Sequence, residues 1–292
     1  MKVRISLGEK LFNVIVYSLL VVIFLVVFFP LMYVVSSSFA SARELAANRF
    51  VIIPKEPTLE VYQYIFSTST FLRSMLVTIF ITVVGTIVNL VMTCLMAYPL
   101  SRRNLPGRKW IMMGVTFTLV FNGGMIPTYL VVSGLGMIDS YWSLIIPGAI
   151  SSFNLILVKN FFQEIPESLI DAAQIDGSSE MNTLMKIVLP LSKPALATFT
   201  MFYAVGHWNQ FLQPLLYIND SAKWPIQILL RQIVLMSQSG VGDEDAMPPG
   251  FVLPVKSLKM ACIVVSTLPI IAAYPFMQKY FDKGVMTGSI KG

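Results

Sequence analysis

The chain has 292 residues, of which 55% are hydrophobic and only 12% are charged. A soluble domain of this size could not stay in solution with that balance, so the composition indicates an integral membrane protein. The formal net charge of +6 comes mostly from basic residues in a few short loops, which does not indicate a nucleic-acid-binding surface.

Six apolar runs are long enough to cross a bilayer as helices. A spanning helix needs about 20 apolar residues, whereas a barrel would use alternating strands of about 10 residues. The sequence therefore predicts an all-α membrane protein with one transmembrane domain over residues 1–292. Its six predicted spans lie near residues 12–37, 72–100, 110–133, 140–162, 194–218 and 258–280.

The amino-terminal run has a competing interpretation as a secretory signal peptide. Lys2 and Arg4 precede it, and Ala40-Ser41-Ala42 resembles a cleavage site. However, the run has about 25 residues, and the apolar core of a signal peptide has 7–15. The length favours an uncleaved helix.

Basic residues predict the orientation, because they are retained on the cytoplasmic side of short loops. They cluster before the first run, between the second and third runs, and after the last run. Both termini and the loop at 164–193 are therefore predicted to be cytoplasmic, with the segments at 38–71 and 219–257 outside. The clusters are Lys2, Arg4 and Lys10; Arg102, Arg103, Arg108 and Lys109; and Lys279, Lys283 and Lys291.

Residues 164–193, which we call the polar loop, carry signals for two short helices. A proline favours the first turn of a helix, and a glycine in the left-handed conformation ends one. A serine can then cap a second helix, which later prolines would break. In chain order, these signals are Pro166, Gly177, Ser178 or Ser179, Pro190 and Pro194.

The polar loop could dock another protein or lie on the lipid surface. Membrane-surface helices favour Lys and Arg on their polar face, but the polar residues here are acidic. The paired alanines leave a thin face against which a partner's groove could close. These features favour docking. The residues concerned are Glu164, Glu167, Asp171, Asp176 and Glu180, with Ala172 and Ala173.

The spacing within the polar loop resembles a known motif. Asp171-Ala172-Ala173, three residues, Gly177, nine residues and Ile187-Val188-Leu189-Pro190 reproduce the EAA loop that ABC importer permeases present to a cytoplasmic ATPase. Asp171 stands where that motif usually has Glu, which keeps the carboxylate but shortens its reach by one methylene.

The resemblance extends along the last two-thirds of the chain, whereas the first 70 residues match only in outline. It is to the carbohydrate-uptake, maltose-permease-like branch, and within it to the oligosaccharide group of alginate- and rhamnogalacturonan-type importers. The further matching stretches are Gly123–Tyr129, Phe161-Phe162 before Ile165-Pro166, Leu189–Pro194, Gly206–Asn209 and Gly288–Gly292.

The resemblance implies an ABC type I importer permease fold in a bacterial cytoplasmic membrane. The implied partners are a second permease in a heterodimer, two ATP-binding subunits, an extracytoplasmic solute-binding protein and a saccharide. The sequence lacks the phosphate loop G-x-x-x-x-G-K-[ST], so a partner is expected to bind ATP and Mg, with no cofactor and no catalytic residue in this chain. The implied ATPase-coupling residues are Glu167, Asp171, Ala172, Ala173, Asp176, Gly177, Leu189 and Pro190.

Polar residues inside the predicted spans are costly and therefore informative. The densest cluster lies in the fifth run, around Trp208. Such groups could bond neighbouring helices or line a sugar path, where amides offer donors and acceptors and Trp offers a stacking face. The candidate path residues are Asn122, Asn154, His207, Trp208, Asn209 and Gln210.

An outer segment, residues 236–250, combines glycines, three consecutive acids and a proline pair. It is either a solvated loop or, as the resemblance implies, a finger that enters the binding protein's cleft. The candidate contact residues are Gly240, Gly242, Asp243, Glu244 and Asp245.

Two other classes of function have less support. A proton-coupled carrier usually needs an intramembrane carboxylate, and no Asp or Glu lies in the six runs. An intramembrane enzyme would need a nucleophile with a base, or a metal cluster. His207 is the only histidine, and no H-E-x-x-H or G-x-S-x-G motif occurs. A permease of the same type for a non-sugar solute remains an alternative.

Overall fold

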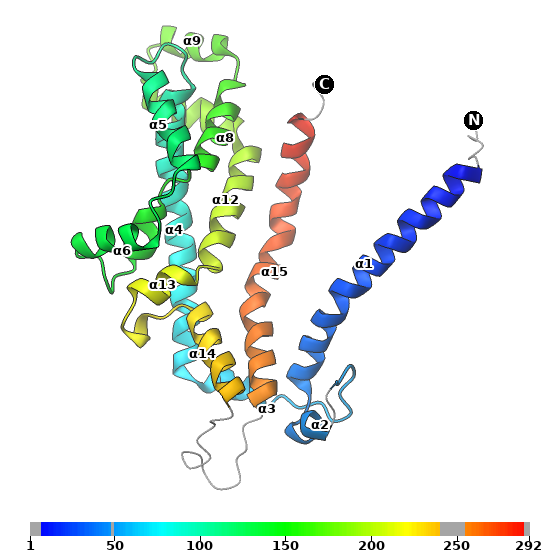
Figure 1. Cartoon of the computed structure of the whole chain (residues 1–292). Coiled ribbons are helices and arrows are strands. Elements are labelled where there is room, and N and C mark those ends of the chain that lie inside the picture. The colour runs from blue at the N-terminus through cyan, green and yellow to red at the C-terminus, as the bar shows by residue number, and fades with distance from the viewer. Residues whose placement is uncertain (1–6, 48–49, 240–254, 289–292) are drawn as a thin grey trace. The chain divides into compact units, whose positions relative to one another are not determined.

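The computed structural model describes residues 7–47, 50–239 and 255–288 (Figure 1). Every regular element in these ranges is a helix, and Ala40 and Pro57 form an isolated bridge. The predicted all-α class is confirmed. The elements are α1 (Leu7–Phe39), α2 (Ala42–Ala47), α3 (Glu60–Ser67), α4 (Ser69–Ser101), α5 (Arg108–Val120), α6 (Met125–Gly134), α7 (Trp142–Ile145), the 3-10 helix η1 (Ile146–Gly148), α8 (Ser152–Gln163), α9 (Glu167–Ile175), α10 (Glu180–Thr183), the π-helix η2 (Leu184–Val188), α11 (Leu189–Leu191), α12 (Lys193–Trp208), α13 (Leu212–Tyr217), the 3-10 helix η3 (Ser221–Lys223), α14 (Ile226–Ser239) and α15 (Val255–Gly288).

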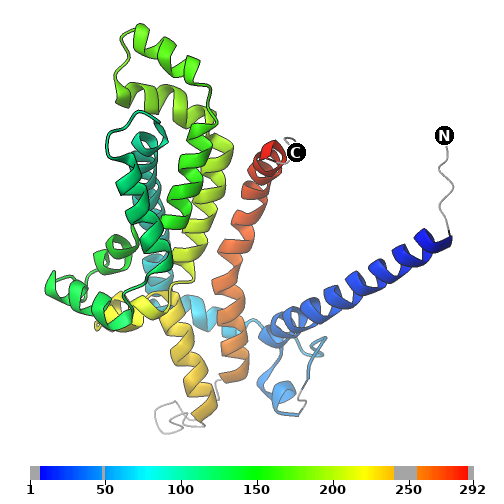
Figure 2. The same cartoon turned by 45° about the horizontal axis from the view of Figure 1, so that its top comes forward.

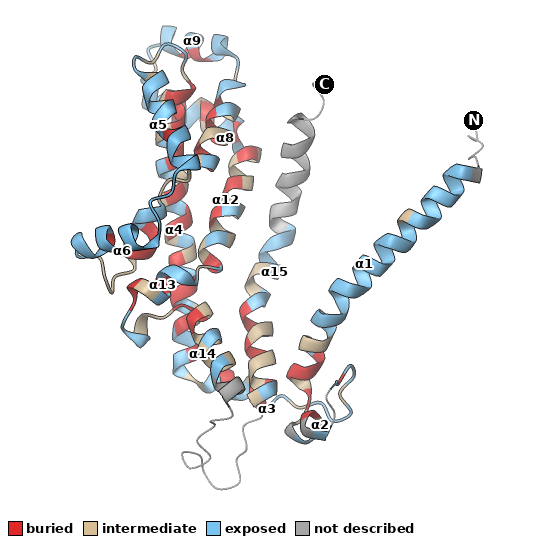
Figure 3. Cartoon of the chain, viewed as in Figure 1, coloured by how far each residue is buried: buried red, intermediate tan, exposed pale blue. Residues whose placement is uncertain are grey.

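Three continuous helices have the length and composition of membrane spans. They are Gly8–Phe39 within α1, the whole of α4, and Val255–Pro275 within α15. They coincide with the first, second and sixth apolar runs. Figure 3 shows that the side chains of α1 are exposed along most of the helix. A helix that is apolar on all sides needs an apolar surrounding, and a bilayer supplies one.

The other three predicted spans are not straight helices, because the runs 110–133, 140–162 and 194–218 each contain a break. In the third run, α5 and α6 meet at 118°, with Gly124 between them at φ +91°. Glycine adopts that left-handed conformation without a steric penalty. The helix therefore breaks there despite its apolar composition.

The fourth and fifth runs also break. The segment Trp142–Gly148 meets α8 at 54°. In the fifth run, α12 ends at Trp208 and α13 begins at Leu212 as a separate short helix. A third bend, of 86°, separates Glu180–Leu191 from α12. The described residues thus contain three spanning helices, or up to six if each bent pair counts as one span, and the number six remains a prediction.

The chain divides into two compact units. The first contains the residues up to Ser69 and Leu230–Leu268, and the second contains Thr70–Leu229 and the residues from Pro269. Within the first unit, Ala40, Leu45 and Val51 form a small core. The hydroxyls of Ser38 and Tyr62 lie 2.6 Å apart.

The described residues of the second unit form two apolar cores. In Figures 1 and 2, α8 lies beside α5 and α12, and α9 lies across one end of these helices. The larger core joins α4, α5, α8 and α12 to two residues of η2, Leu184 and Val188. The smaller core lies between α4, α6, α7 and α13. These cores fix the polar loop and a polar cavity, described next, within one unit.

Candidate functional site

The first half of the polar loop folds as its sequence predicts. Pro166 is the N-cap residue of α9, and Gly177 follows the helix at φ +78°. The Ser178 N–H donates to the Ala173 carbonyl at 2.9 Å, and the Gly177 N–H donates to the Gln174 carbonyl at 3.0 Å. These two bonds form a Schellman motif, which requires a left-handed residue at the position of Gly177.

The second half of the loop follows the prediction except at Pro190. Of the two candidate caps, Ser179 caps the helix by accepting the Asn182 N–H at 3.3 Å. The predicted break at Pro190 is wrong, because α10, η2 and α11 continue to Leu191, and the bend falls at Ser192. The wider π-turn just before Pro190 relaxes the usual bonding pattern and accommodates a residue without an N–H. Pro194 begins α12, as a first-turn proline should.

The loop presents an exposed acidic face. Glu167, Asp171, Ala172, Asp176 and Gly177 are all exposed, and Ile175 beside them is 86% exposed. The paired alanines divide: Ala172 points outward, whereas Ala173 is 8% exposed and packs inside with Ile170. Of the remaining predicted coupling residues, Pro190 is exposed and Leu189 is half-buried against the larger core.

A second site is a cavity of about 690 Å³ in the same unit. No Asp, Glu, Lys or Arg is among the described residues that line it. It is instead lined by amides, hydroxyls, aromatic rings and one imidazole. The polar and aromatic lining residues are Asn89, Thr128, Ser143, Ser151, Asn154, Phe202, Tyr203, His207, Asn209, Gln210, Phe211, Gln213 and Tyr217.

The structure brings four of the six predicted path residues to this cavity: Asn154, His207, Asn209 and Gln210. Trp208 does not line it. Its side chain is buried, and its carbonyl accepts a bond from Gln227 at 3.3 Å. Asn122 is also elsewhere, because its Oδ1 accepts the Gly124 N–H at 2.8 Å in the break between α5 and α6. Asn122 shapes that turn.

Asn89, which sequence reasoning missed, holds the cavity together. It is 1% exposed, and its Nδ2 donates to the carbonyls of Gly148 at 2.6 Å and Ala149 at 3.1 Å. Its Oδ1 is left to accept from His207 Nε2 at 2.7 Å. A lone amide in a long apolar run gives little sequence signal, although any polar group buried inside a span needs partners.

The α4 and α12 helices meet closely at this point. A Cβ added to Gly85 would lie 2.5 Å from His207 Nε2, a distance no side chain tolerates. Glycine at this position therefore lets the imidazole lie against the α4 backbone. Residue size at 85 controls the position of His207.

Asn209 and Gln210, the two amides that follow α12, have different roles. Gln210 Nε2 donates to the Leu144 carbonyl at 3.0 Å, a bond to a neighbouring helix. Asn209 Nδ2 donates to the Val205 carbonyl of α12 at 3.0 Å. The interpretation as helix-to-helix bonding therefore fits His207 and Gln210, whereas Asn209 bonds no other helix in the described structure.

The roles of Asn209 and Gln210 give the first prediction. With Asn209 as part of the sugar path that the resemblance implies, Asn209→Leu is expected to slow transport several-fold while assembly and basal ATP hydrolysis are preserved, because only the cavity lining changes. Gln210→Leu is the matched control. It should lower the melting temperature by an amount that reflects about 0.6 kcal/mol for a lost interhelical bond. A less stable Asn209→Leu complex with normal turnover per assembled molecule would exclude a cavity role for Asn209.

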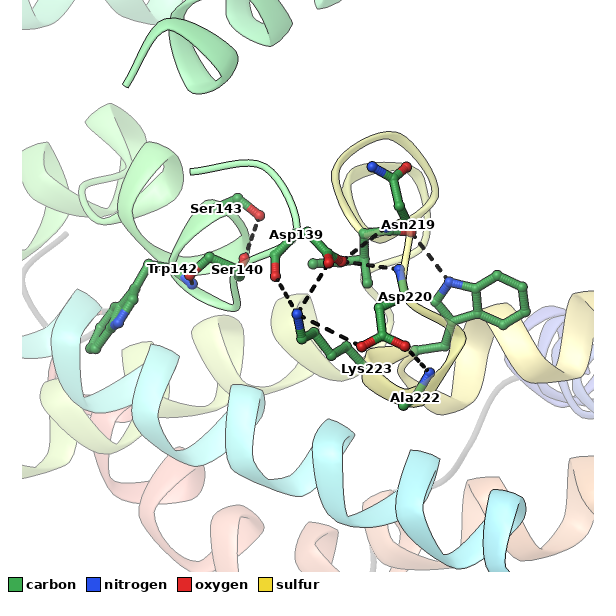
Figure 4. Close-up of polar contacts among 10 residues, drawn as sticks. Asp139, Ser140, Trp142, Ser143, Asn219, Asp220, Ala222 and Lys223 are labelled. Atoms are coloured by element: carbon green, nitrogen blue, oxygen red, sulfur yellow. Dashed lines mark hydrogen bonds and ion pairs between the residues drawn. The ribbon is translucent and has the colours of Figure 1, made fainter. Parts of the chain in front are cut away.

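A polar cluster ties two loops of the second unit together (Figure 4). Asp139, at φ +62°, accepts the backbone N–H groups of Asn219 at 3.1 Å and Asp220 at 3.0 Å. Lys223 Nζ donates to its carboxylate at 3.1 Å and to its carbonyl at 2.9 Å. The Asp220 N–H and the Lys223 ammonium together lower the pKa of Asp139 below its ordinary value of 3.8.

The lowered pKa of Asp139 gives a pH prediction. A carboxyl whose pKa is depressed by folding stabilises the fold above its unfolded pKa and loses that contribution as pH falls through the folded value. Asp139→Asn keeps one side-chain oxygen as an acceptor and tolerates positive φ but removes the charge. The variant should melt below wild type at pH 7, and the difference should shrink as pH falls below about 3.8 and vanish below the lowered pKa of the folded state. A gap that persists in acid would contradict this role of the carboxylate.

The predicted binding-protein contacts Gly240, Gly242, Asp243, Glu244 and Asp245 lie outside the described residues. In the part of the chain that the structure describes, no group of three His, Cys, Asp or Glu side chains could hold a metal ion. The candidate functional sites among the described residues are the acidic face of the polar loop and the uncharged cavity.

Comparison with known proteins shows the family of the chain. Residues 6–287 match the family described as "Binding-protein-dependent transport system inner membrane component". The chain is 50% identical over 284 residues to the polygalacturonan/rhamnogalacturonan transport system permease protein YtcP of Bacillus subtilis (strain 168), covering 97% of this chain and 99% of YtcP. It is 55% identical over 263 residues to protein LplC of the same organism, covering 90% and 89%.

A solved structure shows the same fold. It is a chain of a bacterial ABC transporter involved in import of the acidic polysaccharide alginate, with a TM-score of 0.87 and 30% identity, covering 96% of this chain and all of that chain. The apolar helices, the spacing of the polar loop and these likenesses agree. The chain belongs to the family of binding-protein-dependent transport system inner membrane components, and it is a multi-pass permease with the ABC type I importer fold.

Proposed function

We propose that this chain is one of two permease subunits of an ATP-driven importer for saccharides, with two ATP-binding subunits and an extracytoplasmic binding protein as partners. The relatives that transport polygalacturonan, rhamnogalacturonan and alginate support oligosaccharides from polysaccharide breakdown as the substrate class. The absence of a phosphate loop from the sequence supports ATP and Mg binding by a partner.

The exposed acidic face of α9 is the proposed docking surface for the ATPase. In this arrangement, the polar loop and both termini are cytoplasmic, in agreement with the basic clusters. The observation that carries the proposal is the Schellman turn at Gly177, which ends α9 in a defined conformation while Asp171, Ala172 and Asp176 stay exposed. Asp171 and Ala172 lie on this one short helix, and the hydrogen bonds of the turn fix where the helix ends. A surface with a fixed shape of this kind is suited to binding a protein partner.

The uncharged cavity is the proposed contribution of this chain to the sugar path. Sugar hydroxyls that leave water without new partners cost several kcal/mol in total. Amides and hydroxyls in the lining can replace those water contacts, and the aromatic rings offer apolar faces. Without a fixed charge, the lining would guide a sugar without holding it tightly.

The test is uptake by the complete complex in proteoliposomes, with trigalacturonate and maltotriose as probes. Uptake should require ATP and the loaded binding protein. Uptake driven by a proton gradient alone would instead indicate a secondary carrier. ATP hydrolysis stimulated by a binding protein loaded with a non-sugar solute, with no response to either saccharide, would indicate the non-sugar alternative.

A further inference from the structure

Glu180, at the start of α10, bridges two elements that lie far apart in the sequence. Its Oε2 accepts the Tyr98 hydroxyl of α4 at 2.6 Å, and its Oε1 accepts Gln174 Nε2 of α9 at 2.9 Å. Arg102 closes the cluster. Its Nη2 donates to the Tyr98 hydroxyl at 2.9 Å and lies 3.5 Å from Glu180 Oε2, and its guanidinium lies 5.0 Å from the centre of the Tyr98 ring.

A simpler explanation is that Glu180 only stabilises its own helix. An acid in the first turn interacts favourably with the helix dipole, and an ion pair with a side chain that is 62% exposed contributes little. That explanation leaves two contacts unexplained. The Tyr98 ring is buried, so its hydroxyl needs the partners it finds in Glu180 and Arg102. The bond to Gln174 joins Glu180 to a different helix, α9.

The two halves of the polar loop are attached to α4 unequally. The second half is fixed by Leu184 and Val188, which are buried in the larger core with residues of α4. On the other side, α9 faces α4 across a cavity of about 540 Å³, whose lining includes Asp171, Gln174 and Glu180. Space beside α9 leaves it room to shift. The Glu180 bridge is the polar tie across that space.

The other end of the tie leads toward the sugar cavity. Tyr98 and Asn89 lie nine residues apart on α4, which is about 13 Å at 1.5 Å per residue. Asn89 holds His207 of α12 and the carbonyls at 148 and 149. A displacement of the carboxy-terminal end of α4, where Tyr98 lies, would therefore be carried along one continuous helix to the residues that shape the cavity.

We propose that Glu180 and Tyr98 are positioning residues that make α9 and α4 move as one body, so that displacement of α9 by the ATPase is passed to the cavity. This inference rests on the proposed function. It predicts uncoupling, because neither residue lies on α9, the helix proposed to dock the ATPase. Hydrolysis should continue while less sugar moves.

The experiment compares Tyr98→Phe, Glu180→Ala and the double variant in the complete reconstituted complex. Sugar transported per ATP hydrolysed should fall several-fold, whereas ATP hydrolysis stimulated by the loaded binding protein stays near the wild-type rate. Because both substitutions remove the same bond, the double variant should be no worse than the worse single variant. Glu180→Gln, whose amide oxygen can still accept from Tyr98, should recover most of the ratio.

Tyr62→Phe is the matched control, since it removes another hydroxyl bond, to Ser38, within the first compact unit. It should leave the ratio unchanged. Transport and hydrolysis that fall in parallel, additive effects in the double variant, or loss of assembly in Glu180→Gln would each overturn the proposal and leave Glu180 a stabilising residue only. Failure of the function itself is distinguishable, because the wild-type complex would then show no stimulated hydrolysis.

Discussion

Gly177→Val is expected to abolish ATP hydrolysis stimulated by the loaded binding protein, while the membrane helices still fold. Gly177 has φ +78°, and an added Cβ would meet nothing within 4 Å, so the substitution acts through the backbone alone. A β-branched residue in this conformation costs about 1–3 kcal/mol. The chain can avoid that cost by opening the Schellman turn and re-aiming α9.

The control for this result is Gly136→Val. Gly136 has φ +66° and the same open surroundings but lies outside the polar loop, next to α6. The two variants therefore carry the same chemical change and a similar backbone penalty. Assembly and stimulated hydrolysis should be measured for both in detergent-purified complex. Wild-type stimulation in Gly177→Val, or equal losses in the two variants, would refute a specific role for the turn.

Gly85→Ala is expected to reduce transport strongly and to lower the stability of the complex. Its new Cβ would lie 2.5 Å from His207 Nε2, so the imidazole must leave the Asn89 oxygen. Overpacking of this kind costs about 1–3 kcal/mol, and the displaced His207 leaves the buried Asn89 Oδ1 without the donor it accepts from.

Two further variants isolate the cause of that loss. Gly114→Ala in α5 places the same methyl group in open space and should stabilise the protein slightly, since alanine favours helix by about 1 kcal/mol over glycine. Adding His207→Ala to Gly85→Ala removes the clash and should restore part of the thermal stability, because the Asn89 acceptor still lacks its donor, and should not restore transport. A Gly85→Ala complex as stable as wild type would show that His207 is not confined by α4.

Local sequence signals predicted most of the structure of the polar loop. For the membrane spans, they predicted where the apolar segments lie but not where the helices break. Gly177 and Pro166 act through their own backbone conformations, so their sequence positions sufficed. The break at Gly124 had a signal too, in the adjacent Asn122 and Gly123, but the apolar composition of the run outweighed it. Glycine pairs in an apolar run are better interpreted as break points than as helix.

The cavity was harder to predict, because its members come from helices that only packing brings together. Asn89 lies 118 residues before its partner His207, and no spacing rule joins them. Asn122 and Trp208 were placed in the path by their chemistry, yet one shapes a turn and the other packs inside. The residue types around Trp208 indicated that this segment would contribute to the cavity. Which of its side chains line the cavity depends on tertiary contacts, which the sequence does not show.

The absence of Asp, Glu, Lys and Arg from the described lining of the cavity also has an electrical consequence. A chain that moves no fixed charge of its own as the cavity opens and closes gives the membrane voltage nothing to act on except the cargo. A neutral sugar would then cross at a rate that is independent of voltage. Each uronate carboxylate carried inward against an inside-negative potential would instead add about 2.3 kcal/mol per 100 mV to the work that ATP must supply.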